Sequence, residues 1–307
     1  MKKIIIKYGK YIFSSIILLS LFYYIWHNKS DFVIILSLNI FQILLLSLLV
    51  ILSIISSAYM YYLAIKSFGI KLKTKEWINL AFVNRLTNYF IQKSGLFTRA
   101  FYLKKKYKLS YKNILVLGFY LLGLQIAITI FLILLVLLVN NLWNLNLTIF
   151  LIIIFSLILS LYKSDLFTKF IFKKIKILSP YIYIWQNLNS KPKLLYKLIF
   201  IIFILFLINI IKIYLLYLFL YEAIKISEAI IINSFSMLSF LISFTPAGIG
   251  IRESLMALGG SIMGLDFKSV VIIAVADRAI NMAWLLIIGI PATIWFSNYF
   301  LDKKNDQ

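Results

Sequence analysis

Long apolar runs constrain this chain of 307 residues more than any other feature of its sequence. Phe32–Ile65 and Asn113–Tyr162 carry no charge, and each is longer than the roughly 20 residues that cross a bilayer as a helix. Leu198–Tyr221 contains one charged residue, and Val270–Phe296 contains two. Because such runs fill most of the sequence, we predict an all-α, polytopic membrane protein with about seven or eight transmembrane helices. We expect one integral membrane domain over residues 1–307.

The charges between the runs predict the side on which each loop lies. Met1–Lys10, Lys66–Lys112 and Lys163–Lys197 are rich in lysine and arginine. Short basic loops remain in the cytoplasm, so we predict a multi-pass protein of the cell membrane with a cytoplasmic N-terminus. The formal net charge of +22 then indicates anionic membrane lipids as partners. Nucleic acid is not expected, because no basic segment resembles a nucleic-acid-binding module.

Residue usage and the absence of known motifs limit the kinds of catalytic and metal sites that this chain can contain. The chain has no cysteine and a single histidine, His27, which excludes disulfides, thiolate ligands and multi-histidine metal sites. No Gly-x-Ser-x-Gly elbow, Walker loop or HExxH motif is present. We therefore expect no cofactor and no metal, and a transporter rather than an enzyme.

One stretch, Phe244–Glu253, places a proline, two glycines and an Arg–Glu pair at or near membrane depth. Pro246 removes a backbone donor and predicts a helix break, and Gly248 and Gly250 reach conformations closed to other residues. Non-helical backbone inside a bilayer is buried in protein or lines a wet cavity, and charges there mark functional sites. If a helix begins near Arg252, its N-terminus, the glycine N–H groups and the guanidinium together favour a phosphate.

The other charges at this depth allow two interpretations. Glu253, with Asp277 and Arg278 of the last apolar run, is a candidate for balancing charge or exchanging partners as a site opens. Alternatively, Arg252–Asp277 or Glu253–Arg278 are buried ion pairs that only fix the fold. Lys212 leaves a similar choice between extending to the membrane interface and taking part in transport.

An earlier segment of the chain, around Arg99, repeats the order of residues found around Arg252. Ser94–Arg99 and Ala247–Arg252 both read small–Gly–x–x–x–Arg. Leu109–Asn113 and Leu265–Ser269 follow them, and each precedes an apolar run. Matches of this kind indicate an internal duplication, which is common in transporters.

The duplication predicts repeat halves at 1–162 and 163–307. Since transporter sites lie at repeat interfaces, we expect Gly95 and Arg99 to join the second copy in one headgroup site. Ser254–Leu265 is too short to cross the bilayer, so we predict that it is a re-entrant segment.

The second copy resembles the signature of the lysylphosphatidylglycerol synthase transmembrane-region family, which are flippase-like integral membrane proteins. That signature reads roughly Pro-x-Gly-x-Gly-x-Arg-Glu, followed by a helix bearing an arginine. The matching residues are Pro246, Gly248, Gly250, Arg252 and Glu253, with Asp277 and Arg278 on the later helix. The first copy keeps only Gly95 and Arg99 of the family's Pro-x-x-x-Gly-x-x-x-Arg element. Phe119–Leu122 stands where the family often carries an acidic–arginine pair.

The predicted anion site and the resemblance leave three functions open. The first is a lipid translocase that moves an anionic phospholipid or lipid-linked headgroup between leaflets. The second is a membrane-embedded transferase acting on a lipid-linked sugar, with Asp31, Glu222 or Glu228 as the acid. The third is a non-catalytic membrane partner of a separate lipid-modifying enzyme. Fused members of the family carry a soluble aminoacyl-transferase domain, which we do not expect in this chain.

Overall fold

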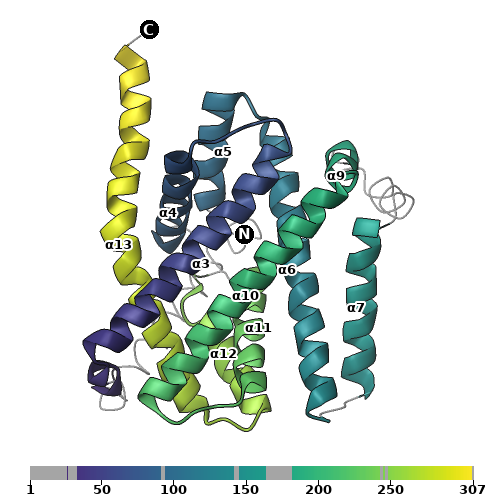
Figure 1. Ribbon diagram of the computed structural model, residues 1–307, viewed down its shortest axis with the longest axis vertical. Coiled ribbons are helices and arrows are strands. Elements are labelled where there is room, and N and C mark those ends of the chain that lie inside the picture. The colour runs from purple at the N-terminus through teal and green to yellow at the C-terminus, as the bar shows by residue number, and fades with distance from the viewer. Residues whose placement is uncertain are drawn as a thin grey trace, which may run out of the picture. The chain divides into compact units, whose positions relative to one another are not determined.

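A computed structural model of the chain describes Trp26 and residues 33–90, 94–141, 145–163, 182–242, 245 and 248–305. These residues form helices and, within the described ranges, no strand, which confirms the all-α prediction. In chain order (Figure 1) the elements are the short 3-10 helix η1 (Val33–Ser37), α3 (Ile40–Lys66), α4 (Thr74–Phe90), α5 (Ser94–Tyr107), α6 (Tyr111–Val139), α7 (Leu145–Lys163), α9 (Ile182–Asn189), α10 (Pro192–Leu220), α11 (Ile226–Ile242), α12 (Ile251–Ile262) and α13 (Phe267–Asn305).

Four of the described helices, α3, α6, α10 and α13, are long and apolar enough to cross a membrane. Thr148–Tyr162 and Ile226–Ile242 are shorter apolar helical segments. The chain is therefore a multi-pass helical membrane protein. The predicted helix break at Pro246, the acid Asp31 and the basic start Met1–Lys10 lie outside the described residues.

The long apolar runs divide at polar residues. The described part of the first run contains η1 and nearly all of α3, and the chain enters α3 through a reciprocal capping pair. The N–H of Gln42 donates to the Asn39 side chain at 2.9 Å, and the N–H of Asn39 donates to the Gln42 side chain at 3.0 Å. This pair satisfies donors that the first helical turn leaves free. Asn113–Tyr162 contains parts of α6 and α7.

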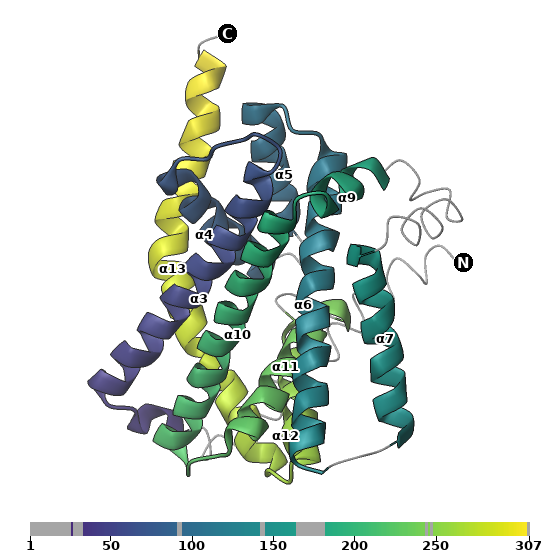
Figure 2. The same cartoon turned by 45° about the vertical axis from the view of Figure 1, so that its right-hand side comes forward.

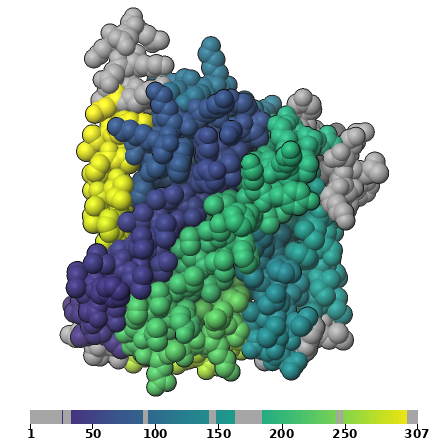
Figure 3. Space-filling view, in the orientation of Figure 1, coloured from purple at the N-terminus to yellow at the C-terminus, as the bar shows by residue number. Residues whose placement is uncertain are grey.

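One side of α10 carries exposed apolar side chains that recur every three or four residues. They are Ile199, Phe200, Phe203, Leu207, Ile211 and Leu218. In the space-filling view this helix, in green, is left largely uncovered along its length (Figure 3). A stripe of this kind suits a helix whose one face meets lipid while the other packs on protein.

The chain divides into two compact units. The first comprises Met1–Ile54, Phe82–Gly95 and Leu207–Gln307, and the second comprises Ile55–Ala81 and Leu96–Phe206. In the first unit α12 packs against α11 and against α13, as Figures 1 and 2 show. In the second unit α6 packs against α7 and α9.

An aromatic cluster holds α6, α7 and α9 of the second unit together. The rings of Tyr120, Tyr162 and Trp185 lie with centroids 4.9–5.4 Å apart. The Tyr162 hydroxyl donates to the main-chain carbonyl of Tyr120 at 2.6 Å. Aromatic pairs at this separation add to the stabilisation that burial alone provides.

A buried carboxylate joins α4 to α5 in the second unit. Glu76 forms an ion pair with Lys106 and accepts hydrogen bonds from Tyr107 at 2.7 Å, Tyr102 at 3.1 Å and the N–H of Lys73 at 2.9 Å. Burial by itself raises the pKa of Glu76. The hydrogen bonds from Lys106, Tyr107 and Lys73 lower the pKa, and together they outweigh the effect of burial. The pKa therefore lies below its ordinary value of 4.5.

Glu76→Gln is expected to lower the free energy of unfolding at neutral pH by about 1.5 kcal/mol, since it weakens charge-assisted hydrogen bonds. A depressed folded-state pKa stabilises the protein above about pH 5, and this stabilisation is lost as the pH falls through the folded-state value. Thermal unfolding of both proteins between neutral and acid pH measures the difference. Glu228→Gln is the matched control, because Glu228 accepts the same type of N–H bond from Lys225, but this bond is exposed. Equal losses in the two variants would contradict this role of Glu76.

The two matched sequence segments form local structures of the same kind. Arg99 lies on the short helix α5, and α6 follows, with the Ser110 side chain accepting an N–H from its first turn at 3.2 Å. Arg252 lies on the short helix α12, and α13 follows, with the Asp266 carboxylate accepting an N–H from its first turn at 2.8 Å. The two copies thus share this local order, and both the duplication and the repeat halves 1–162 and 163–307 stay predictions.

Candidate functional site

Five charged side chains from three helices meet inside the first unit. They are Lys212 of α10, Arg252 and Glu253 of α12, and Asp277 and Arg278 of α13. Three cations thus face two carboxylates. Charges at membrane depth are costly, so a cluster of them is a candidate functional site.

Asp277 lies at the centre of this cluster and is 1% exposed. One carboxylate oxygen lies 2.7 Å from Lys212 Nζ, and the other lies 2.6 Å from Arg252 Nη2. Asn281, one turn later on α13, donates from Nδ2 to the first of these oxygens at 3.1 Å. Two cations therefore neutralise one carboxylate, each through its own oxygen.

Glu253 pairs with Arg278, the residue that follows Asp277 on α13. Its Oε1 lies 2.7 Å from Arg278 Nε, and its Oε2 accepts the N–H of Gly250 at 2.7 Å. The second bond satisfies a donor at the start of α12, as in a capping box. Both ion pairs that the structural interpretation named, Arg252–Asp277 and Glu253–Arg278, are thus formed in the structure.

Arg252 differs from the other members of the cluster in its exposure. Its side chain is 22% exposed, against 5% for Lys212, 12% for Arg278 and 1% for each carboxylate. Its Nε also donates to Ser236 Oγ of α11 at 2.8 Å, which holds the guanidinium in place. Arg252 is therefore the charged group of the cluster that a molecule outside the protein reaches most easily.

Two residues of α4 extend the cluster on another side. Arg85 donates to the main-chain carbonyl of Ser53 at 3.4 Å and lies within electrostatic range of Lys212. Tyr89 lies within range of Arg252 and Arg278. Both are in the part of α4 that belongs to the first unit, so they add a further cation and a hydroxyl to the surroundings of the cluster.

The glycines before α12 have the backbone freedom that the sequence predicts, with φ of +68° at Gly248 and +83° at Gly250. Their N–H groups, however, already have acceptors within the chain. Gly248 donates to the carbonyl of Thr245 at 2.9 Å, and Gly250 donates to Glu253. The helix does begin beside Arg252, since Ile251 is its first residue. A contribution of the two glycines to a headgroup site stays a prediction.

The predicted residues of the first copy fall in different units. Gly95 belongs to the first unit, and its N–H donates to Asn88 Oδ1 at 2.8 Å. Arg99 belongs to the second unit, is 7% exposed and lies over the ring of Tyr61. The joint site of Arg99 and Arg252 therefore also stays a prediction.

Three contacts of the cluster were not assigned from the sequence. Lys212 was visible as a lone charge in an apolar run, but nothing in its neighbours indicated that its partner is Asp277. Ser236 and Asn281 gave no signal, because serine and asparagine occur widely in membrane helices as hydrogen-bonding groups. Their partners become apparent only from the packing of α11 and α13 around α12.

Comparison with known protein families places most of the chain in one of them. Residues 11–289 match the family described as the lysylphosphatidylglycerol synthase TM region. No curated protein and no solved structure matches the chain. The match includes the charged cluster of α10, α12 and α13 as well as the two sequence copies. By this match, the chain belongs to the lysylphosphatidylglycerol synthase TM region family.

Proposed function

We propose that this protein is a lipid translocase that binds an anionic phospholipid or lipid-linked headgroup at Arg252. Its family connects it with lipid handling in a membrane. The observation that carries the proposal is the partial exposure of Arg252 within a buried cluster that holds more cations than carboxylates. An anion bound at Arg252 balances the extra positive charge, and a guanidinium matches phosphate with two parallel hydrogen bonds.

The double pairing of Asp277 makes this exchange feasible. When Arg252 turns from Asp277 to a phosphate, Lys212 still neutralises the carboxylate. An unpaired carboxylate at this depth would oppose the exchange, since a buried charge without a partner is strongly destabilising. In this proposal Glu253 and Arg278 balance each other and hold the first turn of α12, on which Arg252 lies.

Arg252→Gln is expected to lower the rate of lipid movement by at least about tenfold, the equivalent of ~1.4 kcal/mol. The variant should stay folded, because Asp277 keeps Lys212 as its partner. Arg252→Lys should recover only part of the rate, since an ammonium lacks the planar pair of donors. The measurement is the movement of a fluorescent anionic phospholipid between the leaflets of vesicles that contain the purified protein, with thermal stability measured in parallel.

Lys212→Met is the matched control. Lys212 has the same carboxylate partner as Arg252 and the same charge, but its side chain is only 5% exposed. We expect this variant to lose less lipid movement than Arg252→Gln, because Arg252 still reaches the headgroup, although Asp277 then lacks a second partner during the exchange. If both variants lose movement to the same extent, in proportion to their losses of thermal stability, the cluster only fixes the fold and the proposal is wrong.

A further inference from the structure

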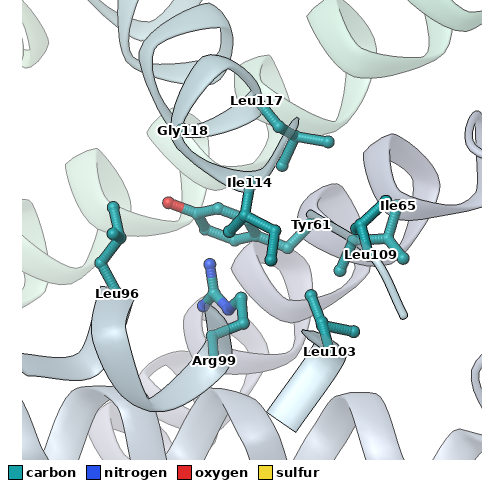
Figure 4. A pocket seen from close by; sticks show the side chains of 9 residues that line it. All are labelled: Tyr61, Ile65, Leu96, Arg99, Leu103, Leu109, Ile114, Leu117 and Gly118. Carbon is teal, nitrogen blue, oxygen red and sulfur yellow. The ribbon is translucent and has the colours of Figure 1, made fainter. Parts of the chain in front are cut away.

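The second unit contains a separate small pocket that ends at a buried arginine. Arg99 of α5 forms one wall, Tyr61 of α3 forms another, and apolar side chains that include Leu96 and Ile114 complete the lining. Figure 4 shows the guanidinium facing the Tyr61 ring, with Leu96 on one side and Gly118 of α6 above. All of these residues belong to the second unit.

Arg99 has no counter-ion in the part of the chain that the structure describes. Its guanidinium carbon lies 3.5 Å from the centroid of the Tyr61 ring, and the side chain is 7% exposed. A ring attracts a cation, but it does not replace a charged or hydrogen-bonding acceptor for a guanidinium removed from water. The bare cation therefore points to an anion that comes from outside the described residues.

The comparison with Arg252 supports the inference that the anion for Arg99 comes from outside the described residues. Arg252, at the matching position of the second copy, pairs with Asp277 on the long helix that follows. In the first copy the long helix that follows is α6, and its stretch Phe119–Leu122 contains no acid. The first copy thus keeps the arginine and lacks the carboxylate that neutralises it in the second copy.

We propose that this pocket binds the anionic end of an acidic amphiphile, through a carboxylate or phosphate oxygen held by Arg99. The free cavity is only about 10 Å³, enough for one water-sized group, so the tip of a small oxyanion enters and a bulky headgroup does not. Apart from Arg99 and Tyr61, the side chains that line the pocket are aliphatic, and they favour an apolar neighbour of that oxyanion over water. Lys104 and Lys105, less than two turns along α5, raise the local concentration of anions.

This site does not depend on Arg252, and the test separates the two. The protein is purified in a neutral alkyl maltoside without anionic lipid, and its melting temperature is measured with and without dodecyl phosphate. Without the amphiphile, Arg99→Met should melt at the same temperature as the parent or higher, because it removes a buried charge that lacks a partner. Dodecyl phosphate at saturation should raise the melting temperature of the parent by about 5 °C and that of Arg99→Met by much less.

Three comparisons decide the outcome. Arg252→Met should keep the part of the shift that Arg99 provides, whereas loss of the whole shift in both single variants would overturn an independent site. Inorganic phosphate should give a small shift, because it lacks the chain; an equal shift would show an adventitious ion only. If Arg99→Met instead melts lower by the same amount in every condition, the arginine is a packing residue and the proposal fails.

Two further variants keep the proposal testable if Arg99→Met folds poorly. Gly118→Asp places a carboxylate on the wall of the pocket, and should raise the melting temperature without ligand while abolishing the shift with dodecyl phosphate. A carboxylate of this chain is the competing partner, and the aspartates outside the described ranges, which are Asp31, Asp165 and Asp306, are the candidates. If replacing one of these residues by Asn lowers the melting temperature without ligand and enlarges the shift with dodecyl phosphate, the counter-ion is internal and the proposal is overturned.

Discussion

Asp277→Asn is expected to lower the free energy of unfolding by about 3–5 kcal/mol, the usual loss when one partner of a buried ion pair is removed. The loss is large because this carboxylate neutralises both Lys212 and Arg252. An asparagine keeps the size of the side chain but leaves two cations without a counter-charge. Thermal unfolding of the purified protein in a neutral detergent measures the effect.

The double variant Lys212→Met/Asp277→Asn is the control for this prediction. It removes the most deeply buried cation together with the carboxylate, and leaves Arg252 with Ser236 and partial access to the surface. We expect it to recover most of the lost stability, since coupled charges behave non-additively. If the losses of stability in Lys212→Met and in Asp277→Asn simply add in the double variant, the two residues act independently. Their ion pair then does not determine stability.

Gly95→Ala is expected to be the second most damaging change, with a loss of about 3 kcal/mol, at the upper end for inserting an atom into packed protein. A Cβ at Gly95 would overlap the main-chain carbonyl oxygen and the side chain of Asn84 on α4. A main-chain atom cannot turn away as a flexible side chain does, so α4 and the start of α5 must separate. The same shift would weaken the hydrogen bond from Gly95 to Asn88.

Gly118→Ala provides the matched control, because it is the same substitution in another helix. A Cβ at Gly118 would meet Leu96 Cδ1 at 3.4 Å, an ordinary contact. We expect this variant to gain about 0.5–1 kcal/mol from the higher helix propensity of alanine. If the two variants change stability by similar amounts, close packing is not the reason for glycine at position 95. If Gly95→Ala leaves stability intact and abolishes lipid movement instead, its predicted role at a headgroup would gain support.

The sequence was sufficient to single out the charged residues that the structure brings together in one cluster. Arg252, Glu253, Asp277 and Arg278 stand out because a charge inside a long apolar run is rare, and it is rare because lipid cannot solvate it. The same reasoning predicted the helices, since each run must satisfy its own backbone hydrogen bonds within the membrane. The sequence raised a helix start near Arg252 only as a condition, and the structure meets this condition because α12 begins at Ile251.

The tertiary structure decided which of these groups meet. The sequence offered two ion pairs and two roles for Lys212, and the packing of α10, α12 and α13 forms both pairs and directs Lys212 to Asp277. The packing also determined that Arg252 is more exposed than Lys212, although both side chains pair with the same carboxylate, that of Asp277. Local pattern cannot determine such contacts, because they depend on the rotation and depth of helices far apart in the chain. A charge in an apolar run shows that it needs a partner, whereas only the packed helices supply one.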